Sequence, residues 1–376
     1  MNEKNDGTKG VKITFTYQGM LEYRGRLLKQ IATLQAAGFD CRLIYGDWGG
    51  RPFKAGDYDF PIEVIPTTKG AFPLALFFRQ LRFGYLAGRK IAESDATHVV
   101  SFALESALAG ALAKRRRSGL KYIIDMNELH IESYISRIKK ILWAPIQKFC
   151  ARKADVIMHA EGNRLEYFKK NHDPGESQQF LLENFPTFVE RETVGERAES
   201  SPIKVLYVGT MGFDRYTKEL VNVFRQLGPK YSLDFVGPIE PDFLEDIERE
   251  LEKDPAPNIQ FKPSIPYRKM GETIRNYHVG IALYKNNCLG NYYCAPNKVY
   301  DYLMNGVTVV ANDYPGLLTV VEEGNLGACV KEVDLDNFRS ALQRIVGERM
   351  WENITEEVRN RYSWEAQTPG YLALFR

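Results

Sequence analysis

Two segments of the chain place glycine and cationic side chains at the boundary between a predicted strand and a predicted helix. The first follows the strand expected at 203–208, and its residues of interest are Gly209, Thr210, Asp214, Arg215, Thr217 and Lys218. Glycine lets the backbone approach a ligand closely, and Asp214 or Thr217 can cap the next helix. The free N–H groups of that helix, with Arg215 and Lys218, suit a diphosphate. An ordinary loop with solvated cations is the alternative.

The second segment is a short predicted helix that begins at Pro296, a residue favoured at the first helical position, and stops at Gly306. Its first turn carries Asn297 and Lys298, and Asp301 lies one turn further along. A carboxylate there can accept hydrogen bonds from ligand hydroxyls. The alternative is a local ion pair between Lys298 and Asp301, worth about 0.2–0.5 kcal/mol.

Alternating strands and helices must position these residues. Apolar, β-branched runs predict strands at 11–17, 41–45, 62–65, 97–102, 121–125 and 155–159, and again at 203–208, 232–236, 259–261, 279–283, 307–311 and 328–330. Helical segments between the strands favour parallel sheets covered on both faces. A charged stretch without apolar periodicity separates the two series. The prediction is an α/β protein with two Rossmann-like, doubly wound domains facing a cleft: domain 1–187, linker 188–202 and domain 203–362.

Composition excludes several classes of protein. The 376 residues fit two domains, and the net charge of 50 − 48 = +2 gives no electrostatic case for nucleic-acid binding. No apolar run is long enough to span a membrane, and the polar N-terminus does not resemble a signal peptide. The five cysteines are scattered, with no CxxC pair, which favours a reducing, cytoplasmic compartment. There is no D-x-D, HxxxH or G-x-G-x-x-G motif, so we expect no metal and no dinucleotide cofactor.

The second segment resembles a known family. It reads Pro296-Asn297-Lys298-x-x-Asp301-Tyr302-Leu303-x-x-Gly306-x-x-Val309-Val310. This pattern is similar to the donor-site helix of retaining, GT-B-fold glycosyltransferases of family 4 (group 1). The usual pattern of that family is P-x-K-x-x-E-Y-x-x-x-G-x-P-V-V. Three further segments fit in the same order: Asp125-Met126-Asn127-Glu128-Leu129 resembles D-x-H-E-L, Leu206-Tyr207-Val208-Gly209 with Arg215 resembles the opening of the donor domain, and Tyr362-Ser363-Trp364-Glu365 resembles F-S-W-E. The resemblance spans nearly the whole chain. It implies that a last helix, 363–376, returns to the first domain.

The resemblance implies that the second domain binds a nucleotide-diphosphate sugar as co-substrate. Arg215, with Lys218 or Lys298, then neutralises the leaving diphosphate, and Asp301 stands where the family has a glutamate that binds the donor ribose. The remaining donor-side residues that it implies are Gly209, Thr210, Ser264, Ile265, Tyr293 and Asn297, with the backbone around Ser264 and Ile265 reading the base.

Two departures from the family pattern concern the transferred sugar. The histidine of D-x-H-E is Asn127 here, and a glutamate expected eight residues before the ribose-binding position is Tyr293. Asn127 and Glu128 are the catalytic candidates beside Arg215. The acceptor-side candidates are Gln18, Gly19, Arg24, Asp125 and His130. Buried structural roles are the alternatives for Asp125, Glu128 and His130.

The implied activity is metal-independent hexosyl transfer with retention to an acceptor hydroxyl, in bacterial surface polysaccharide or glycolipid assembly. A GT-B-fold nucleotide-sugar epimerase is one alternative. A non-catalytic partner subunit is another, because of Asn127 and Tyr293.

Basic and apolar residues share the helices near 74–85 and 137–148, and 114–117 is also basic, so we expect peripheral docking on the anionic inner face of the cell membrane. Helices that face the core are the alternative.

Overall fold

The computed structural model describes residues 10–48, 53–67, 73–132, 137–190, 202–294 and 297–376. The chain forms two compact units. Unit 1 comprises Met1–Glu183 and Gln367–Arg376, and unit 2 comprises Asn184–Ala366. The chain therefore leaves unit 1 at Glu183 and re-enters it at Gln367, whereas the sequence placed the linker at 188–202. Most of the expected linker, 191–201, lies outside the described residues.

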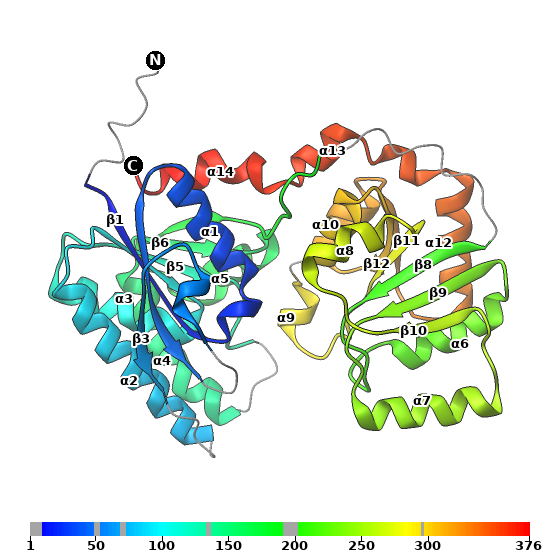
Figure 1. The fold of residues 1–376 in the computed structure, drawn as a ribbon, viewed down its shortest axis with the longest axis horizontal. Coiled ribbons are helices and arrows are strands. Elements are labelled where there is room, and N and C mark those ends of the chain that lie inside the picture. The colour runs from blue at the N-terminus through cyan, green and yellow to red at the C-terminus, as the bar shows by residue number, and fades with distance from the viewer. Residues whose placement is uncertain (1–9, 49–52, 68–72, 133–136, 191–201, 295–296) are drawn as a thin grey trace. The chain divides into compact units, whose positions relative to one another are not determined.

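Unit 1 contains a parallel sheet with helices on both faces (Figure 1). Its seven strands run in the order β3-β2-β1-β4-β5-β6-β7. Their bounds are β1 Lys12–Gly19, β2 Asp40–Asp47, β3 Ile62–Pro66, β4 His98–Phe102, β5 Lys121–Met126, β6 Val156–His159 and β7 Gln178–Leu181. The central strands are buried almost throughout because helices cover both faces, which explains their continuous apolar runs.

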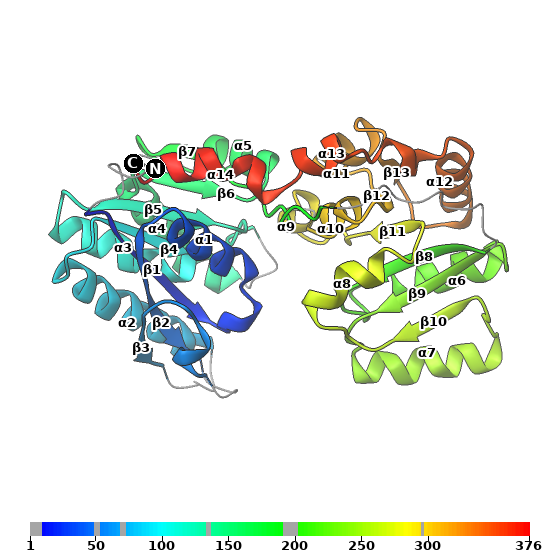
Figure 2. The same cartoon turned by 45° about the horizontal axis from the view of Figure 1, so that its top comes forward.

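The helices of unit 1 match the apolar periodicity of the sequence. They are η1 Leu21–Tyr23, α1 Gly25–Ala36, η2 Ala55–Asp57, α2 Pro73–Ala92, α3 Leu104–Arg116, α4 Arg137–Lys153 and α5 Gly162–Asn171, joined by α14, Trp364–Ala373. Most of α14 belongs to unit 1 although it comes last in the chain (Figure 2). No helix in the described part of the chain is long and apolar enough to cross a membrane.

Unit 2 repeats the architecture with six parallel strands in the order β10-β9-β8-β11-β12-β13. The strands are β8 Ile203–Val208, β9 Tyr231–Val236, β10 Ile259–Lys262, β11 Val279–Ala282, β12 Thr308–Asn312 and β13 Gly327–Val330. The helices are α6 Thr217–Leu227, α7 Pro241–Lys253, α8 Tyr267–Ile274, α9 Leu289–Tyr292, α10 Asn297–Met304, α11 Pro315–Leu317, η3 Leu318–Glu322, α12 Leu335–Gly347, η4 Met350–Asn353 and α13 Glu356–Arg361. The α/β class and the doubly wound parallel sheets are confirmed.

The strand orders locate the ligand sites of both sheets. In a doubly wound sheet, ligands bind beyond the carboxyl ends of the strands where the order reverses. The reversal falls between β1 and β4 in unit 1, and between β8 and β11 in unit 2. Gln18 and Gly19 end β1, and Gly209 follows β8. Each of these candidates therefore lies at such a point.

Candidate functional site

Two cations, Arg215 and Lys298, interact electrostatically near the end of β8. The ammonium Nζ of Lys298, in the first turn of α10, lies 4.7 Å from the ring centroid of Tyr207 and 5.7 Å from that of Tyr284. Burial, and next the positive charge of Arg215, lower the pKa of Lys298 to about 8. Neither Arg215 nor Lys298 has a carboxylate partner among the described residues. The pair therefore has a net positive charge that an anion can neutralise.

A bare glycine backbone borders this cation pair. Gly209 has φ +140°, and a Cβ atom there would meet Lys298 Nζ at 2.7 Å. Its N–H donates to the carbonyl of Val236 at 3.0 Å, and Gly237 then packs against the Gly209 carbonyl so tightly that no Cβ fits. The chain just after β8 and the chain just after β9 can therefore approach each other closely, because neither glycine carries a side chain. An anionic ligand can approach the Gly209 backbone and the Lys298 ammonium together.

The loop between β8 and α6 differs from its sequence prediction in two ways. Lys218 pairs with Asp246 and lies 3.9 Å from Glu250, both on α7. These carboxylates hold its ammonium, so Lys218 is not part of the unpaired cation pair. The expected cap is wrong as well: Tyr216 precedes α6 without a side-chain capping bond, and Thr217 is already helical. Thr210, beyond Gly209, is exposed.

A small cavity of about 100 Å³ adjoins Lys298. Its lining residues are Val208, Met270, Ile274, Lys298, Asp301 and Tyr302. The hydroxyl of Tyr302 accepts from the N–H of Val208 at 3.1 Å and donates to the carbonyl of Leu206 at 3.2 Å. These bonds fix α10 against β8, so Lys298 and Asp301 both face one cavity at the strand end.

The other donor-side candidates surround this region within unit 2. Asn297 is exposed on the first turn of α10, and Tyr293 stacks edge-on against Tyr292 with ring centroids 5.0 Å apart. Ser264 is exposed and Ile265 is half-buried in the loop after β10. Residues 295–296, which include the expected helix start at Pro296, lie outside the described residues.

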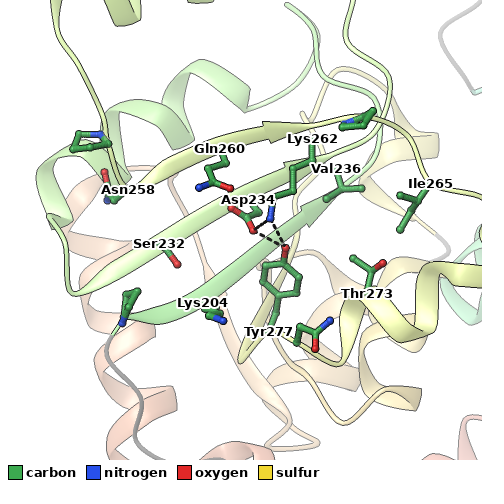
Figure 3. A pocket seen from close by; sticks show the side chains of 14 residues that line it. Lys204, Ser232, Asp234, Val236, Asn258, Gln260, Lys262, Ile265, Thr273 and Tyr277 are labelled. Atoms are coloured by element: carbon green, nitrogen blue, oxygen red, sulfur yellow. Dashed lines mark hydrogen bonds and ion pairs between the residues drawn. The ribbon is translucent and has the colours of Figure 1, made fainter.

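A larger hollow of about 680 Å³ lies on the β8–β9–β10 part of the sheet, beside α8 (Figure 3). Asp234 accepts hydrogen bonds from Lys262 Nζ at 2.5 Å and from the Tyr277 hydroxyl at 2.6 Å. Burial and the Asp234 carboxylate raise the pKa of Tyr277. Ile265 lines one end of this hollow and Asn258 the other. Lys262 and Asp234 neutralise each other, and the further cation that lines the hollow, Lys204, is exposed, whereas burial lowers the pKa of Lys298.

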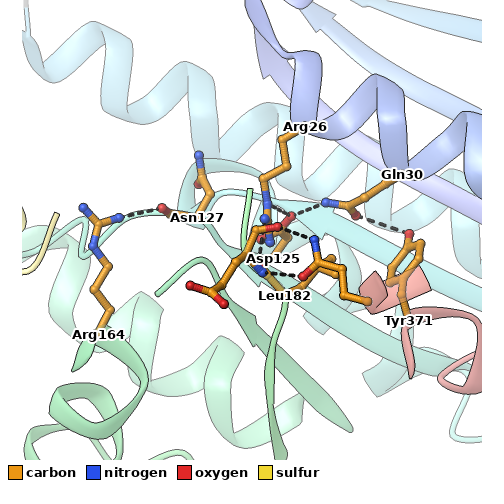
Figure 4. A network of polar contacts seen from close by, with 9 residues as sticks. Arg26, Gln30, Asp125, Asn127, Arg164, Leu182 and Tyr371 are labelled. Carbon is orange, nitrogen blue, oxygen red and sulfur yellow. Dashed lines mark hydrogen bonds and ion pairs between the residues drawn. The ribbon is translucent and has the colours of Figure 1, made fainter. Parts of the chain in front are cut away.

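In unit 1, Asp125 lies inside the protein (Figure 4). Its carboxylate accepts two hydrogen bonds from Arg26, from Nε at 2.8 Å and from Nη2 at 3.0 Å, and a third from Gln30. Arg26 also donates to the carbonyl of Leu182, and Tyr371 on α14 donates to Gln30. These bonds join α1, β5, the end of β7 and α14. The structure thus gives Asp125 the buried structural role, out of an acceptor's reach.

The other acceptor-side candidates gather at the carboxyl ends of β1, β4 and β5. Gln18 Nε2 donates to the carbonyl of Glu105 at 2.5 Å, and His130 Nδ1 lies 3.4 Å from Glu105 Oε1. Arg24 Nε donates to the Tyr17 hydroxyl at 2.6 Å. Glu105 was missed by sequence reasoning. The available signal was its place in the first turn of a helix that follows a buried strand.

The two catalytic candidates of unit 1 follow β5 directly. Asn127 is half-buried, and its carbonyl accepts a hydrogen bond from Arg164 Nη1 at 2.8 Å. Glu128 is exposed. Gly19 has φ +140°, and the Tyr17 hydroxyl occupies the space that a Cβ atom would need. Gly19, Asn127 and Glu128 therefore border the same strand-end region as Arg24 and His130.

Residues 189–366 match the model of the family described as glycosyl transferases group 1. No curated protein matches the chain in sequence.

Solved structures resemble the whole chain in fold. Sucrose-phosphate synthase from Thermosynechococcus elongatus has a TM-score of 0.72 at 17% identity, over 97% of this chain and 98% of that one. The lipopolysaccharide outer core galactosyltransferase WaaB has a TM-score of 0.71 at 16% identity, over 96% and 99%. HepE of Anabaena, in complex with UDP and glucose, has a TM-score of 0.71 at 11% identity, over 96% and 98%. The expected GT-B fold is confirmed.

Proposed function

We propose that the protein transfers a hexose from a nucleoside-diphosphate sugar to an acceptor hydroxyl with retention of configuration, because residues 189–366 match the family model of the group 1 glycosyl transferases. One observation carries the proposal: Lys298 lies beside the bare backbone of Gly209 and interacts electrostatically with Arg215, and neither cation has a carboxylate partner in the described part of the chain. HepE has also been solved with UDP-glucose, which supports this class of donor.

In the proposed reaction, the acceptor oxygen forms a bond to the anomeric carbon on the face from which the diphosphate leaves. The bond between that carbon and the phosphate oxygen breaks, and its electron pair goes to the diphosphate. The acceptor's proton passes to the same departing oxygen. Arg215 and Lys298 stabilise the charge that grows on the diphosphate, as preorganised cations do for developing negative charge. We propose that these cations serve in place of a divalent metal ion.

The remaining candidates have these proposed roles. In unit 2, Gly209, Thr210 and Asn297 contact the phosphates, and the backbone around Ser264 and Ile265 reads the base. Tyr293 borders the sugar. In unit 1, Asn127 and Glu128 contact the transferred sugar. Biologically, we propose that the product belongs to a surface polysaccharide or glycolipid.

We assign Asp301 to the donor ribose, because it shares the cavity beside Lys298. A carboxylate that accepts from a ribose hydroxyl favours a ribonucleotide over its 2′-deoxy analogue. The wild type is therefore expected to bind UDP about tenfold more tightly than 2′-deoxy-UDP. If the protein selects another base, the same ratio is expected for that nucleoside diphosphate and its 2′-deoxy analogue. Calorimetric titration of Asp301→Ala should give equal affinities for the two. If the ratio of the two affinities is the same in Asp301→Ala as in the wild type, the assignment of Asp301 to the ribose is contradicted.

A screen of nucleotide sugars tests the proposed function. A ligand at one hundred times its dissociation constant stabilises the folded protein by about 2.7 kcal/mol, so the true donor raises the melting temperature. Release of nucleoside diphosphate from that donor should then accelerate when an acceptor is added. Release of nucleoside diphosphate that no acceptor accelerates favours the epimerase, and binding without turnover favours the non-catalytic subunit. If no nucleotide binds, the donor site is wrongly assigned.

We also propose that α2 and α4 dock on an anionic membrane surface. Phe78, Ile138 and Ile141 have exposed fractions of 65%, 65% and 72%. Arg82, one helical turn after Phe78 on α2, is also exposed. Trp143, within the basic and apolar segment near 137–148, is buried, and its ring centroid lies 5.5 Å from that of Phe77. Exposed apolar side chains among cations are typical of helices that lie in a membrane interface.

This docking proposal predicts binding to vesicles of mixed phosphatidylcholine and phosphatidylglycerol that salt weakens. Ile141→Asp should reduce the bound fraction several-fold, because it removes apolar contact and adds repulsion. Val64→Asp is the matched control, since Val64 is an exposed apolar residue on edge strand β3. Co-sedimentation measures both. Equal binding to neutral vesicles, or equal loss in the two variants, contradicts the proposal.

A further inference from the structure

A carboxylate that no sequence motif marked, Glu105, lies at the point where the strand order of unit 1 reverses. It belongs to the first turn of α3, which follows β4 after a single residue, Ala103. Ala103 has φ +66°, which is a strained conformation for a residue other than glycine. Its N–H donates to the carbonyl of Asp125 at 3.0 Å. Strain of this kind persists where the surrounding structure holds it, and it is common at functional sites.

Two side chains from other strand ends fix Glu105. Gln18 donates to its main-chain carbonyl, and His130 Nδ1 lies 3.4 Å from its Oε1 atom. Both members of the Glu105–His130 pair are partly accessible, with exposed side-chain fractions of 23% and 20%. Its second oxygen, Oε2, has no hydrogen-bond donor among the residues that the structure describes. Glu105 is thus held through one oxygen and leaves the other available.

An unpaired buried acceptor accompanies this carboxylate. Gln18 is 3% exposed, and its Oε1 atom has no hydrogen-bond partner in the described part of the chain. Such an atom is rare in a folded protein, because leaving it unpaired costs free energy. It belongs to the amide whose nitrogen binds Glu105, so strain and an unsatisfied polar atom occur together at the start of α3.

The surrounding charges indicate what kind of ligand fits. Arg24 interacts electrostatically with both Glu128 and Glu105, and it is hydrogen-bonded to Tyr17. Two carboxylates, one guanidinium and one imidazole provide acceptors and donors in similar number. They suit the hydroxyls of an uncharged sugar, since two carboxylates repel a phosphate group. Because these four groups are charged or polar, they do not provide an apolar surface for an apolar ligand.

We propose that Glu105 recognises the acceptor sugar: its Oε2 atom accepts a hydrogen bond from a hydroxyl next to the one that attacks. His130 is a positioning residue that holds the carboxylate through Oε1. Glu105 takes no proton, because the acceptor's proton passes to the leaving diphosphate. This inference rests on the proposed glycosyl transfer, and it assigns to that reaction the chemical class of its acceptor, a neutral sugar.

The test uses the full chain and the donor that the nucleotide-sugar screen selects. Octyl glycosides of glucose, galactose, mannose and N-acetylglucosamine serve as acceptor probes, and release of nucleoside diphosphate is the readout. Glu105→Gln is expected to raise the KM for the active glycoside about tenfold, with the KM for donor and the slow hydrolysis of donor in water unchanged. Glu166→Gln, on the exposed face of α5, is the matched control.

A second pair of variants separates positioning from folding. His130→Gln keeps a donor for Glu105 and should retain a low acceptor KM, whereas His130→Leu removes the donor and should behave like Glu105→Gln. Equal acceptor KM values in the wild type and Glu105→Gln overturn the inference, and so does a wild type that none of the four glycosides stimulates. Failure of every nucleotide sugar to bind is a different result, which overturns the proposed function itself.

Discussion

Replacing Lys298 by methionine is expected to weaken the binding of nucleoside diphosphate about 30- to 100-fold. Methionine keeps the packing between the rings of Tyr207 and Tyr284 but removes the charge. A hydrogen bond to a charged group contributes about 1.5–3 kcal/mol, and each 1.4 kcal/mol corresponds to a factor of ten in affinity. Calorimetric titration measures the change. Lys253→Met, on the exposed end of α7, is the matched control and should bind like the wild type.

The pH dependence of this binding has a definite sign. The pKa of Lys298 is lowered to about 8 by burial and by Arg215. A bound diphosphate favours the ammonium form, so the affinity is highest below pH 8 and falls as the pH rises through that value and the lysine loses its proton. The wild type should therefore lose affinity between pH 7.5 and pH 9.5, and Lys298→Met should lack this step. A step of equal size in both proteins contradicts the assignment of the charge to Lys298.

Replacing Asp125 by asparagine is expected to destabilise the protein by about 3–5 kcal/mol. The substitution leaves Arg26 buried without a counter-charge, and removing one partner of a buried ion pair is strongly destabilising. The same carboxylate also holds Gln30, through which α14 is bound. The free energy of unfolding, measured with urea, should fall by this amount.

The surface pair Arg89–Glu93 provides the comparison for this prediction. Both of its side chains are more than half exposed, at 61% and 62%. Glu93→Gln should therefore change the free energy of unfolding by less than about 1 kcal/mol. If Asp125→Asn costs no more than Glu93→Gln, the buried network does not stabilise unit 1 as described.

The alternation of apolar and polar segments was sufficient to predict both sheets, because buried parallel strands are nearly continuous apolar runs. It was not sufficient for β7, Gln178–Leu181, whose residues are half-buried or exposed at the edge of the sheet and lack such a run. The four-residue helix α9 and the uncapped start of α6 also lack a local signal. Short and edge elements depend on their neighbours more than on their own sequence.

The donor-side candidates have clearer signals in the sequence than the acceptor-side candidates. Arg215 follows the end of β8, and Lys298 and Asp301 belong to a recognisable helical motif that precedes β12. In the structure the two cations interact electrostatically within unit 2. In unit 1, the partner of Asp125 lies 99 residues away in the chain, and no periodicity indicates that the pair is buried. Glu105 depends on the strained backbone of Ala103, a conformation that the residue type does not indicate.

The central claim is that Arg215 and Lys298 form the site for the donor's diphosphate. Calorimetric titration of wild type and Arg215→Ala with UDP, GDP, ADP, CDP and dTDP tests it most directly. At least one of these should bind the wild type with one site per chain, and Arg215→Ala should weaken that binding at least 30-fold without lowering the melting temperature of the free protein. A wild type that binds none of them, or an Arg215→Ala variant that binds equally well, contradicts the claim.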